Sequence, residues 1–119
     1  MKLAYTLSTC DTSRKIVEQS KITQLSFEIK DIKLSSITEL ELDYMHALAG
    51  SYEALFSKHS QKYKILGLKD LTLSEDDFKK LILQEYTFLK RPVIIVGNRI
   101  FIGNSKANVD ALLKLLETI

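Results

Sequence analysis

The chain has 119 residues and a formal net charge of +2; 45% of its residues are hydrophobic and 27% are charged. This size is typical of one domain, here residues 1–119, and no apolar run approaches the roughly 20 residues that span a bilayer. Because lysines and arginines are scattered among acids, we expect neither a membrane partner nor direct binding to nucleic acid.

The first third of the chain predicts a strand, a helix and a second strand. Residues 3–7 are a short apolar run that predicts a buried strand, and residues 9–13 form a polar turn. Ile16 and Val17 begin an apolar helical stripe that ends near Ser20. Apolar residues then alternate with polar ones, as in a strand with one buried face: Leu25, Phe27 and Ile29.

The middle of the chain is predicted to be helical. Ser36 and Glu39 have the spacing of a capping box, and Gly50 marks a helix end. Ser51 is predicted to cap a short helix, and residues 57–64 read as a basic, polar loop. The apolar positions expected to face inward in these two helices are Leu40, Tyr44, Ala47, Leu48, Tyr52, Leu55 and Phe56.

A further helix and a hairpin follow. Ser74 and Asp77 mark the helix start, with an inward stripe of Phe78, Leu81 and Ile82. Two β-branched runs, 93–96 and 99–102, are joined by Gly97 and Asn98, a strong signal for a two-residue hairpin turn. A last helix begins at Ser105, and its apolar residues recur at helical spacing: Val109, Leu112, Leu113 and Leu116.

This order of elements predicts an α/β fold of the thioredoxin-like class. A βαβ unit comes first and a ββα unit comes last, which gives a mixed sheet. The predicted helices at about 36–88 form an insertion between the two halves.

The single cysteine, Cys10, lies between the first strand and the first helix. The free N–H groups and the dipole of a helix N-terminus favour a thiolate there. Ser13 can offer a hydroxyl to the sulfur, and Arg14 and Lys15 add positive charge, whereas Asp11 adds negative charge. The alternative is a buried, inert cysteine, which is common for this residue type.

One cysteine also bears on the compartment. An internal disulfide is impossible, and the N-terminus becomes polar too soon for a signal peptide. We therefore expect a cytoplasmic protein.

Arg91 and Pro92 enter the first strand of the hairpin, and Pro92 is the only proline of the chain. One interpretation is the start of an edge strand with an exposed arginine. The other is a cis proline beside the thiol, with Arg91 turned towards an oxyanion. Neither a metal site nor a bound cofactor is predicted, since His46 and His59 have no metal-ligand spacing; His46 is expected to be a packing or surface histidine.

Four segments resemble the glutaredoxin-linked arsenate reductase family, which also includes the Spx-type transcription regulators. They span essentially the whole chain: Leu7-Ser8-Thr9-Cys10-Asp11-Thr12-Ser13-Arg14-Lys15, Tyr52-Glu53-Ala54-Leu55-Phe56, Phe88-Leu89-Lys90-Arg91-Pro92-Val93 and Phe101-Ile102-Gly103-Asn104.

The resemblance implies that Cys10 is the nucleophile, that Arg91 orients the oxyanion and that Pro92 is cis. It also implies glutathione as the co-substrate and glutaredoxin as the partner that resolves a mixed disulfide. Residues expected to support the site are Thr12, Ser13, Arg14, Pro92, Lys58 and His59.

Two positions depart from the reductase pattern. The reductases have an arginine in the loop that matches Ser57-Lys58-His59 and another near Gly103-Asn104, and this chain has neither. Lysine and histidine supply only point contacts to an oxyanion, whereas arginine binds it through two parallel hydrogen bonds. In addition, Ser13 replaces the second cysteine of many relatives, so any disulfide must form with an outside thiol.

These observations leave three hypotheses about function. The first is a thiol-dependent reductase with a small oxyanion, nominally arsenate, or a disulfide as substrate. The second is a Spx-like regulator that binds RNA polymerase without turnover. The third is a thioredoxin-like domain in which Cys10 is only structural.

Overall fold

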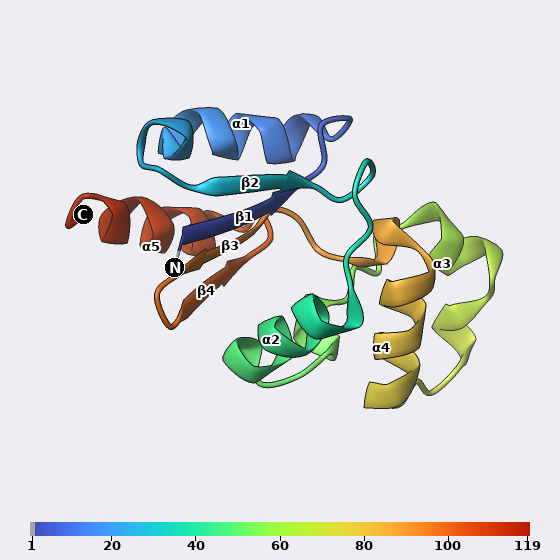
Figure 1. The fold of residues 1–119 in the computed structure, drawn as a ribbon. Helices are drawn as coiled ribbons and strands as arrows, with labels where there is room; N and C mark the ends of the chain where they lie inside the picture. The colour runs from blue at the N-terminus through green and yellow to red at the C-terminus, as the bar shows by residue number, and fades with distance from the viewer. Residues whose placement is uncertain (1) are drawn as a thin grey trace. The chain divides into compact units, whose positions relative to one another are not determined.

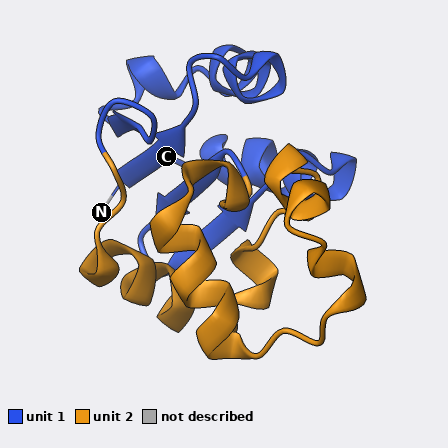
Figure 2. Ribbon diagram, turned by 90° about the vertical axis from the view of Figure 1, so that its right-hand side faces the viewer, with its two compact units in different colours: residues 1–35, 91–119 blue, residues 36–90 orange. Residues whose placement is uncertain are grey.

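The computed structural model describes residues 2–119. The chain forms two compact units, which Figure 2 colours separately. Of the described residues, 2–35 and 91–119 form the first unit and 36–90 form the second. No helix among the described residues is long and apolar enough to cross a membrane.

The first unit contains a four-stranded mixed sheet in the order β2-β1-β3-β4 (Figure 1). β1 pairs in parallel with β2 and antiparallel with β3, and β3 pairs antiparallel with β4. The predicted α/β, thioredoxin-like arrangement with a mixed sheet is confirmed. The strands are β1 (Lys2–Thr6), β2 (Glu28–Asp31), β3 (Val93–Val96) and β4 (Arg99–Ile102).

Two helices pack on one face of this sheet. They are α1 (Asp11–Ser20) and α5 (Lys106–Leu116), and a short 3-10 turn, η1 (Ile22–Gln24), follows α1. Side chains alternate across a strand, so one face takes every second residue. The buried cluster that joins both helices to the sheet is Ala4, Ile16, Ile22, Ile94, Phe101, Leu112 and Leu116.

The second strand is shorter than its alternating pattern suggested. The pattern began at Leu25, but β2 begins at Glu28. Leu25 and Phe27 pack against the core cluster from outside the strand, whereas Ile29 is 38% exposed. β2 lies at the edge of the sheet, where one flank has no neighbouring strand to cover a side chain.

The regular elements of the second unit are all helices or 3-10 turns, apart from one isolated bridge. Its elements are α2 (Glu39–Ala49), η2 (Glu53–Leu55), α3 (Gln61–Ile65), η3 (Leu68–Asp70), α4 (Glu75–Gln84) and η4 (Tyr86–Phe88). The predicted loop at 57–64 is therefore partly wrong, because α3 begins inside it, capped by the Ser60 hydroxyl, which accepts from the Lys62 N–H.

The start and the inward face of α2 also differ from prediction. The capping box is formed by Thr38 and Glu41 instead of Ser36 and Glu39. Leu42 and Met45 are fully buried, whereas Leu40 is 81% exposed. Of the other predicted inward positions, Tyr44 and Ala47 are exposed and Leu48 is half-buried.

An aromatic cluster forms the core of the second unit. The Phe56 ring lies 4.9 Å from that of Phe78, 5.0 Å from that of Phe88 and 6.1 Å from that of Tyr63, centre to centre. Phe56 also forms an antiparallel bridge with Leu89. This bridge and the stacked rings tie the segment after η2 to the segment after η4.

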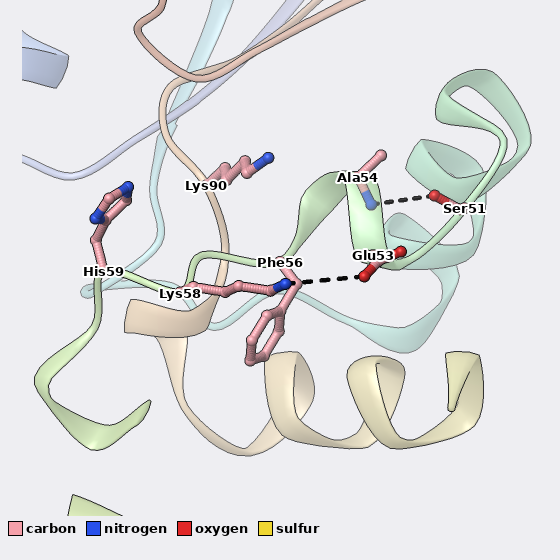
Figure 3. A pocket seen from close by; sticks show the side chains of 7 residues that line it. All are labelled: Ser51, Glu53, Ala54, Phe56, Lys58, His59 and Lys90. Atoms are coloured by element: carbon pink, nitrogen blue, oxygen red, sulfur yellow. Dashed lines mark hydrogen bonds and ion pairs between the residues drawn. The ribbon is translucent and has the colours of Figure 1, made fainter. Parts of the chain in front are cut away.

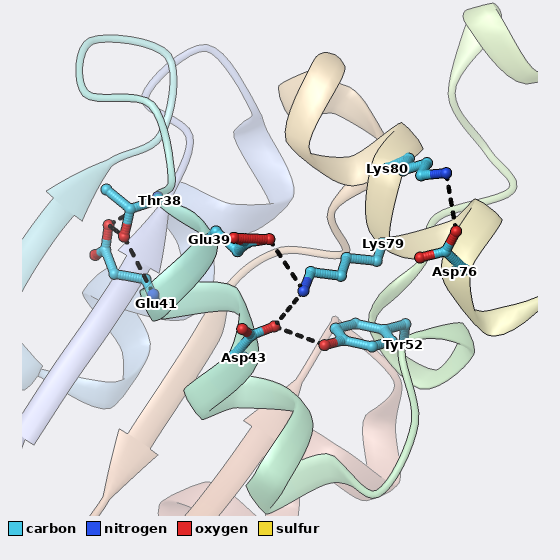
Figure 4. A network of polar contacts seen from close by, with 8 residues as sticks. All are labelled: Thr38, Glu39, Glu41, Asp43, Tyr52, Asp76, Lys79 and Lys80. Atoms are coloured by element: carbon cyan, nitrogen blue, oxygen red, sulfur yellow. Dashed lines mark hydrogen bonds and ion pairs between the residues drawn. The ribbon is translucent and has the colours of Figure 1, made fainter.

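Polar side chains join α2 to α4 in the same unit (Figure 4). The Lys79 Nζ lies 3.1 Å from a Glu39 carboxylate oxygen and 3.0 Å from one of Asp43, while the Tyr52 hydroxyl donates to Asp43 at 2.6 Å. The hydrogen bond from Tyr52 and that from Lys79 lower the pKa of Asp43. Hydrogen bonds to Asp43 and Glu39 raise the pKa of Lys79. His46 stacks on Tyr52, as expected of a packing histidine.

Candidate functional site

Cys10 lies at the turn between β1 and α1, where it is the N-cap residue of the helix. Its backbone is extended, with φ −101° and ψ 110°, and its carbonyl accepts the Arg14 N–H at 3.0 Å. Its own N–H donates to the Leu7 carbonyl at 3.0 Å, which closes the turn. Cys10 is half-buried, and its side chain makes no capping hydrogen bond. A helix N-terminus presents free backbone N–H groups and the positive end of the helix dipole.

The neighbours of Cys10 in α1 divide into one buried and several exposed side chains. Ser13 is fully buried, and its Oγ accepts the Leu7 N–H at 3.4 Å, which fixes the start of the helix against the end of β1. Thr12 is exposed. Arg14 is exposed and forms an ion pair with Asp11, so the positive charge predicted beside the thiol is partly neutralised.

Asp31 anchors the same turn, and sequence reasoning did not identify it. Asp31 is the last residue of β2, which runs parallel to β1. It therefore lies at the same end of the sheet as the Cys10 turn, which follows β1. A hydrogen bond from the Ser8 hydroxyl, with others from the backbone N–H groups of Lys33 and Ser8, lowers the pKa of the Asp31 carboxyl. A polar residue that ends a strand parallel to the one before Cys10 was the signal that could have found it.

The peptide bond between Arg91 and Pro92 is cis. Val93 pairs with Tyr5, so Pro92 lies one residue beyond the last pair of β1 and β3. It is at the end of the sheet where β1 leads into the Cys10 turn. β3 is a central strand between β1 and β4, so the edge-strand interpretation of Pro92 is wrong. Pro92 is buried and Arg91 half-buried.

A third segment reaches this edge of the sheet. The Gly103 N–H donates to the Pro92 carbonyl at 2.9 Å, and the Asn108 side chain donates to the Gly103 carbonyl at 2.9 Å. Gly103 has a positive φ of 82°, a conformation that favours glycine. The topology of the first unit therefore brings the Cys10 turn, Arg91–Pro92 and the Gly103 turn to one end of the sheet.

Lys58 and His59 belong to the second unit, where they line a pocket of about 480 Å³ (Figure 3). Lys90, which sequence reasoning did not single out, lines the same pocket. The Lys90 N–H donates to the Leu55 carbonyl at 2.8 Å, and the Ser57 N–H donates to the Phe88 carbonyl at 2.7 Å. This pairing of 55–57 with 88–90 brings the two segments that carry the cations together.

One acid also lines that pocket. The Lys58 Nζ lies 4.0 Å from a Glu53 carboxylate oxygen, and both side chains are more than half exposed. Such an exposed pair holds its partners only weakly. No group of three or more histidine, cysteine, aspartate or glutamate residues in 2–119 could hold a metal ion.

The sequence matches the ArsC family over residues 5–112. It is 30% identical over 105 residues to the "Global transcriptional regulator Spx 2" of Bacillus anthracis, a match that covers 87% of this chain and 79% of that protein. It is 25% identical over 112 residues to the regulatory protein MgsR of Bacillus subtilis (strain 168), covering 93% of this chain and 86% of that protein.

Solved structures share the fold over nearly the whole chain. A putative arsenate reductase from Yersinia pestis has a TM-score of 0.76 at 17% identity, with 98% of this chain and 99% of that chain covered. A putative ArsC family related protein from Bacteroides fragilis has a TM-score of 0.78 at 20% identity, covering 93% and 96%. A Staphylococcus aureus protein solved by NMR has a TM-score of 0.74 at 28% identity, covering 93% and 97%.

Proposed function

Because this chain belongs to the ArsC family, we propose that it is a thiol-dependent oxidoreductase in which the Cys10 thiolate is the nucleophile. The observation that supports this most is the half-buried Cys10 thiol at the N-cap of the ten-residue helix α1. Free backbone N–H groups and the helix dipole stabilise negative charge at this position. The reaction also suits a reducing compartment, so we assign the protein to the cytoplasm.

The proposed cycle uses two thiols from two molecules, since the chain holds a single cysteine. The Cys10 thiolate attacks the oxidised substrate and forms a covalent bond to it, displacing a substrate oxygen as water or a substrate sulfur as a thiol. The glutathione thiol then attacks the Cys10 sulfur; the bond to the substrate breaks with its electron pair, so the substrate leaves reduced by two electrons and Cys10 and glutathione form a mixed disulfide. A thiolate of glutaredoxin then attacks the glutathione sulfur and releases Cys10 as a thiolate. No step needs a metal or a bound cofactor.

Arg91 is the proposed ligand for an anionic substrate. It directly precedes Pro92 at the edge of the sheet to which β1 leads. A guanidinium can bind two oxygens of one oxyanion through parallel hydrogen bonds. The parts in substrate binding predicted for Lys58 and His59, and the supporting parts of Thr12, Ser13 and Arg14, stay predictions.

The test measures how fast the thiol reacts with oxidised glutathione, read as the mass of the intact protein. The matched control is the double variant Cys10→Ser with Ser35→Cys, which has one thiol at an exposed position outside any helix. At about pH 6 an ordinary thiol, with a pKa of about 8.5, is almost entirely protonated. We expect Cys10 to react about tenfold faster than the control thiol although it is less exposed; an equal or slower rate would contradict the proposal.

The oxyanion substrate is tested separately. Arsenate-dependent NADPH oxidation is measured with glutathione, glutaredoxin and glutathione reductase, with Cys10→Ser as the control. Activity above that control, lost in Arg91→Ala, supports arsenate as a substrate. If no activity appears while Cys10 still reacts rapidly with oxidised glutathione, arsenate is excluded and the thiol chemistry of the proposal stands.

A second candidate function is a regulator that binds RNA polymerase without turnover. It is favoured by the two curated relatives, both of which are named as regulators. The redox switch that the family resemblance implies for such regulators needs a second cysteine, which this chain lacks. Binding to purified RNA polymerase, measured by co-elution in gel filtration, tests this candidate; co-elution that is unchanged in Cys10→Ser would support a regulator that does not use the thiol.

A further inference from the structure

The second unit has a groove, half of whose lining residues are leucines, that the Cys10 chemistry does not use. The segment that follows α3 runs beside α4 (Figure 1), and the two enclose a groove of about 380 Å³. Four leucines line it, two from the η3 segment, one from the chain just before α4 and one from α4 itself. They are Leu68, Leu71, Leu73 and Leu81, and the polar lining residues are Thr72, Asp77, Lys80 and Gln84.

Aliphatic side chains are exposed along the segment that leads into this groove. Leu71 is 58% exposed although it lines the groove, and Ile65 and Leu66, at the end of α3, are 73% and 54% exposed. Single exposed aliphatic residues are ordinary, but three within seven residues of one segment form a patch. Removing this patch from water would stabilise a complex.

Asp77 and Lys80 line the groove itself, and the segment that leads into it, residues 61–71, is rich in lysine. Lys62, Lys64 and Lys69 are exposed, and no ion pair in the described part of the chain involves any of them. Within residues 61–71, Asp70 is the one acid. The segment therefore carries an excess of positive charge next to its exposed aliphatic side chains.

The acids at the start of α4 are already engaged inside the unit. The Glu75 carboxylate accepts the backbone N–H groups of Tyr52 and Glu53, at 2.7 and 3.1 Å. Asp76 pairs with Lys80 at 2.9 Å, and Asp77 accepts the Ser74 N–H at 2.9 Å. These carboxylates thus have partners of their own, whereas the lysines of residues 61–71 do not.

We propose that this groove binds an acidic amphipathic helix of a partner protein. The apolar face of such a helix would enter the groove between Leu71 and Leu81. Its carboxylates would pair with the exposed lysines of the preceding segment, Lys62, Lys64 and Lys69. A lipid surface fits less well, because a concave groove accepts side chains from a partner, and three lysines add only about 1 kcal/mol each at an anionic membrane. The proposal is independent of the Cys10 chemistry.

The test uses a fluorescein-labelled synthetic helix with leucines at positions i, i+3, i+4 and i+7 and glutamates elsewhere. Binding to the full chain is followed by fluorescence anisotropy at low and high salt. Two variants address the groove, Leu71→Ser and Lys64→Glu. Their matched controls are Leu34→Ser, at a leucine that is 84% exposed in the first unit, and Lys106→Glu, at an exposed lysine of α5. Circular dichroism checks that each variant is folded.

We expect saturable binding that weakens with salt and that falls about tenfold, or about 1.4 kcal/mol, in each groove variant but not in its control. Absence of saturation up to about 1 mM peptide would overturn the proposal. So would equal losses in the groove and control variants, or equal binding of the same peptide with lysines in place of glutamates. Binding to phosphatidylglycerol vesicles without binding to the peptide would identify the patch as a membrane contact instead.

Discussion

Replacing Phe56 by alanine should destabilise the protein strongly, because this ring is the centre of the aromatic core of the second unit. Phe56 is 1% exposed, and its ring contacts those of Phe78 and Phe88 at 4.9 and 5.0 Å. Truncation removes the buried ring and leaves a cavity that the neighbouring rings can fill only in part. Replacing a buried phenylalanine by alanine lowers the free energy of unfolding by about 3–5 kcal/mol.

This loss is large beside the total stability of a domain, which is about 5–15 kcal/mol. With 119 residues and an unfolding entropy of about 2.1 cal/mol/K per residue, each kcal/mol lowers Tm by about 4 °C. Phe56→Ala should therefore lower Tm by about 12–20 °C. The pocket lined by Lys58 and Lys90 should be perturbed as well, since Phe56 itself lines it and bridges to Leu89.

Urea unfolding followed by circular dichroism measures the change in free energy. Leu34→Ala is the control, because that leucine is 84% exposed and its truncation should change stability by no more than about 0.5 kcal/mol. If Phe56→Ala does not fold, Phe56→Leu keeps most of the volume and should cost about 1 kcal/mol. A loss below about 1 kcal/mol in Phe56→Ala would refute the assignment of this ring to a packed core.

Three further changes test the capping box, the anchor of the Cys10 turn and the single thiol. Thr38→Ala should cost about 0.5–2 kcal/mol in urea unfolding, because it removes the N-cap of α2, whereas Ser36→Ala should change little; equal effects would contradict the capping box. The pKa of Asp31 is lowered from 3.8, so its contribution to stability is present above that pH and is lost as the pH falls through the lowered value. Asp31→Asn should therefore flatten the acid limb of a stability–pH curve between about pH 5 and 2, and an unchanged limb would count against the hydrogen bond from Ser8. Ser13→Cys should give an internal disulfide with Cys10 under oxidised glutathione, seen as an intact mass two hydrogens lighter; persistence of the glutathione adduct would show that the buried position 13 cannot reach the sulfur.

Local signals in the sequence predicted several elements to the residue. The hairpin strands at 93–96 and 99–102 agree with β3 and β4, since their β-branched runs flank a two-residue turn. The start of α4 at Ser74 is confirmed as well, and the helix expected from Ser105 is α5, which Ser105 caps. These features depend on neighbours within a few residues, so the sequence contains what decides them.

Other features depend on distant partners, and the sequence left them open or predicted them wrongly. The inward face of α2 was misassigned because Leu40 and Leu42 are equally apolar, and only packing decides that Leu42 is buried. β1 pairs with β3, although about ninety residues separate the two strands. This pairing makes β3 a central strand, next to Pro92, and leaves β2, which contains Ile29, at the edge of the sheet. Nothing local signals that pairing.

The candidate site divides in the same way. The sequence by itself determined that one thiol, Cys10, lies between a strand and a helix, and that no second cysteine can resolve its disulfide. Only the tertiary structure decided that Arg91 and a cis Pro92 lie at the same end of the sheet as the Cys10 turn. It also decided that Asp31 holds that turn through a hydrogen bond from Ser8. The physical reason is strand pairing. β2 pairs in parallel with β1 and β3 pairs antiparallel with it, so residues far apart in the chain meet at one end of the sheet.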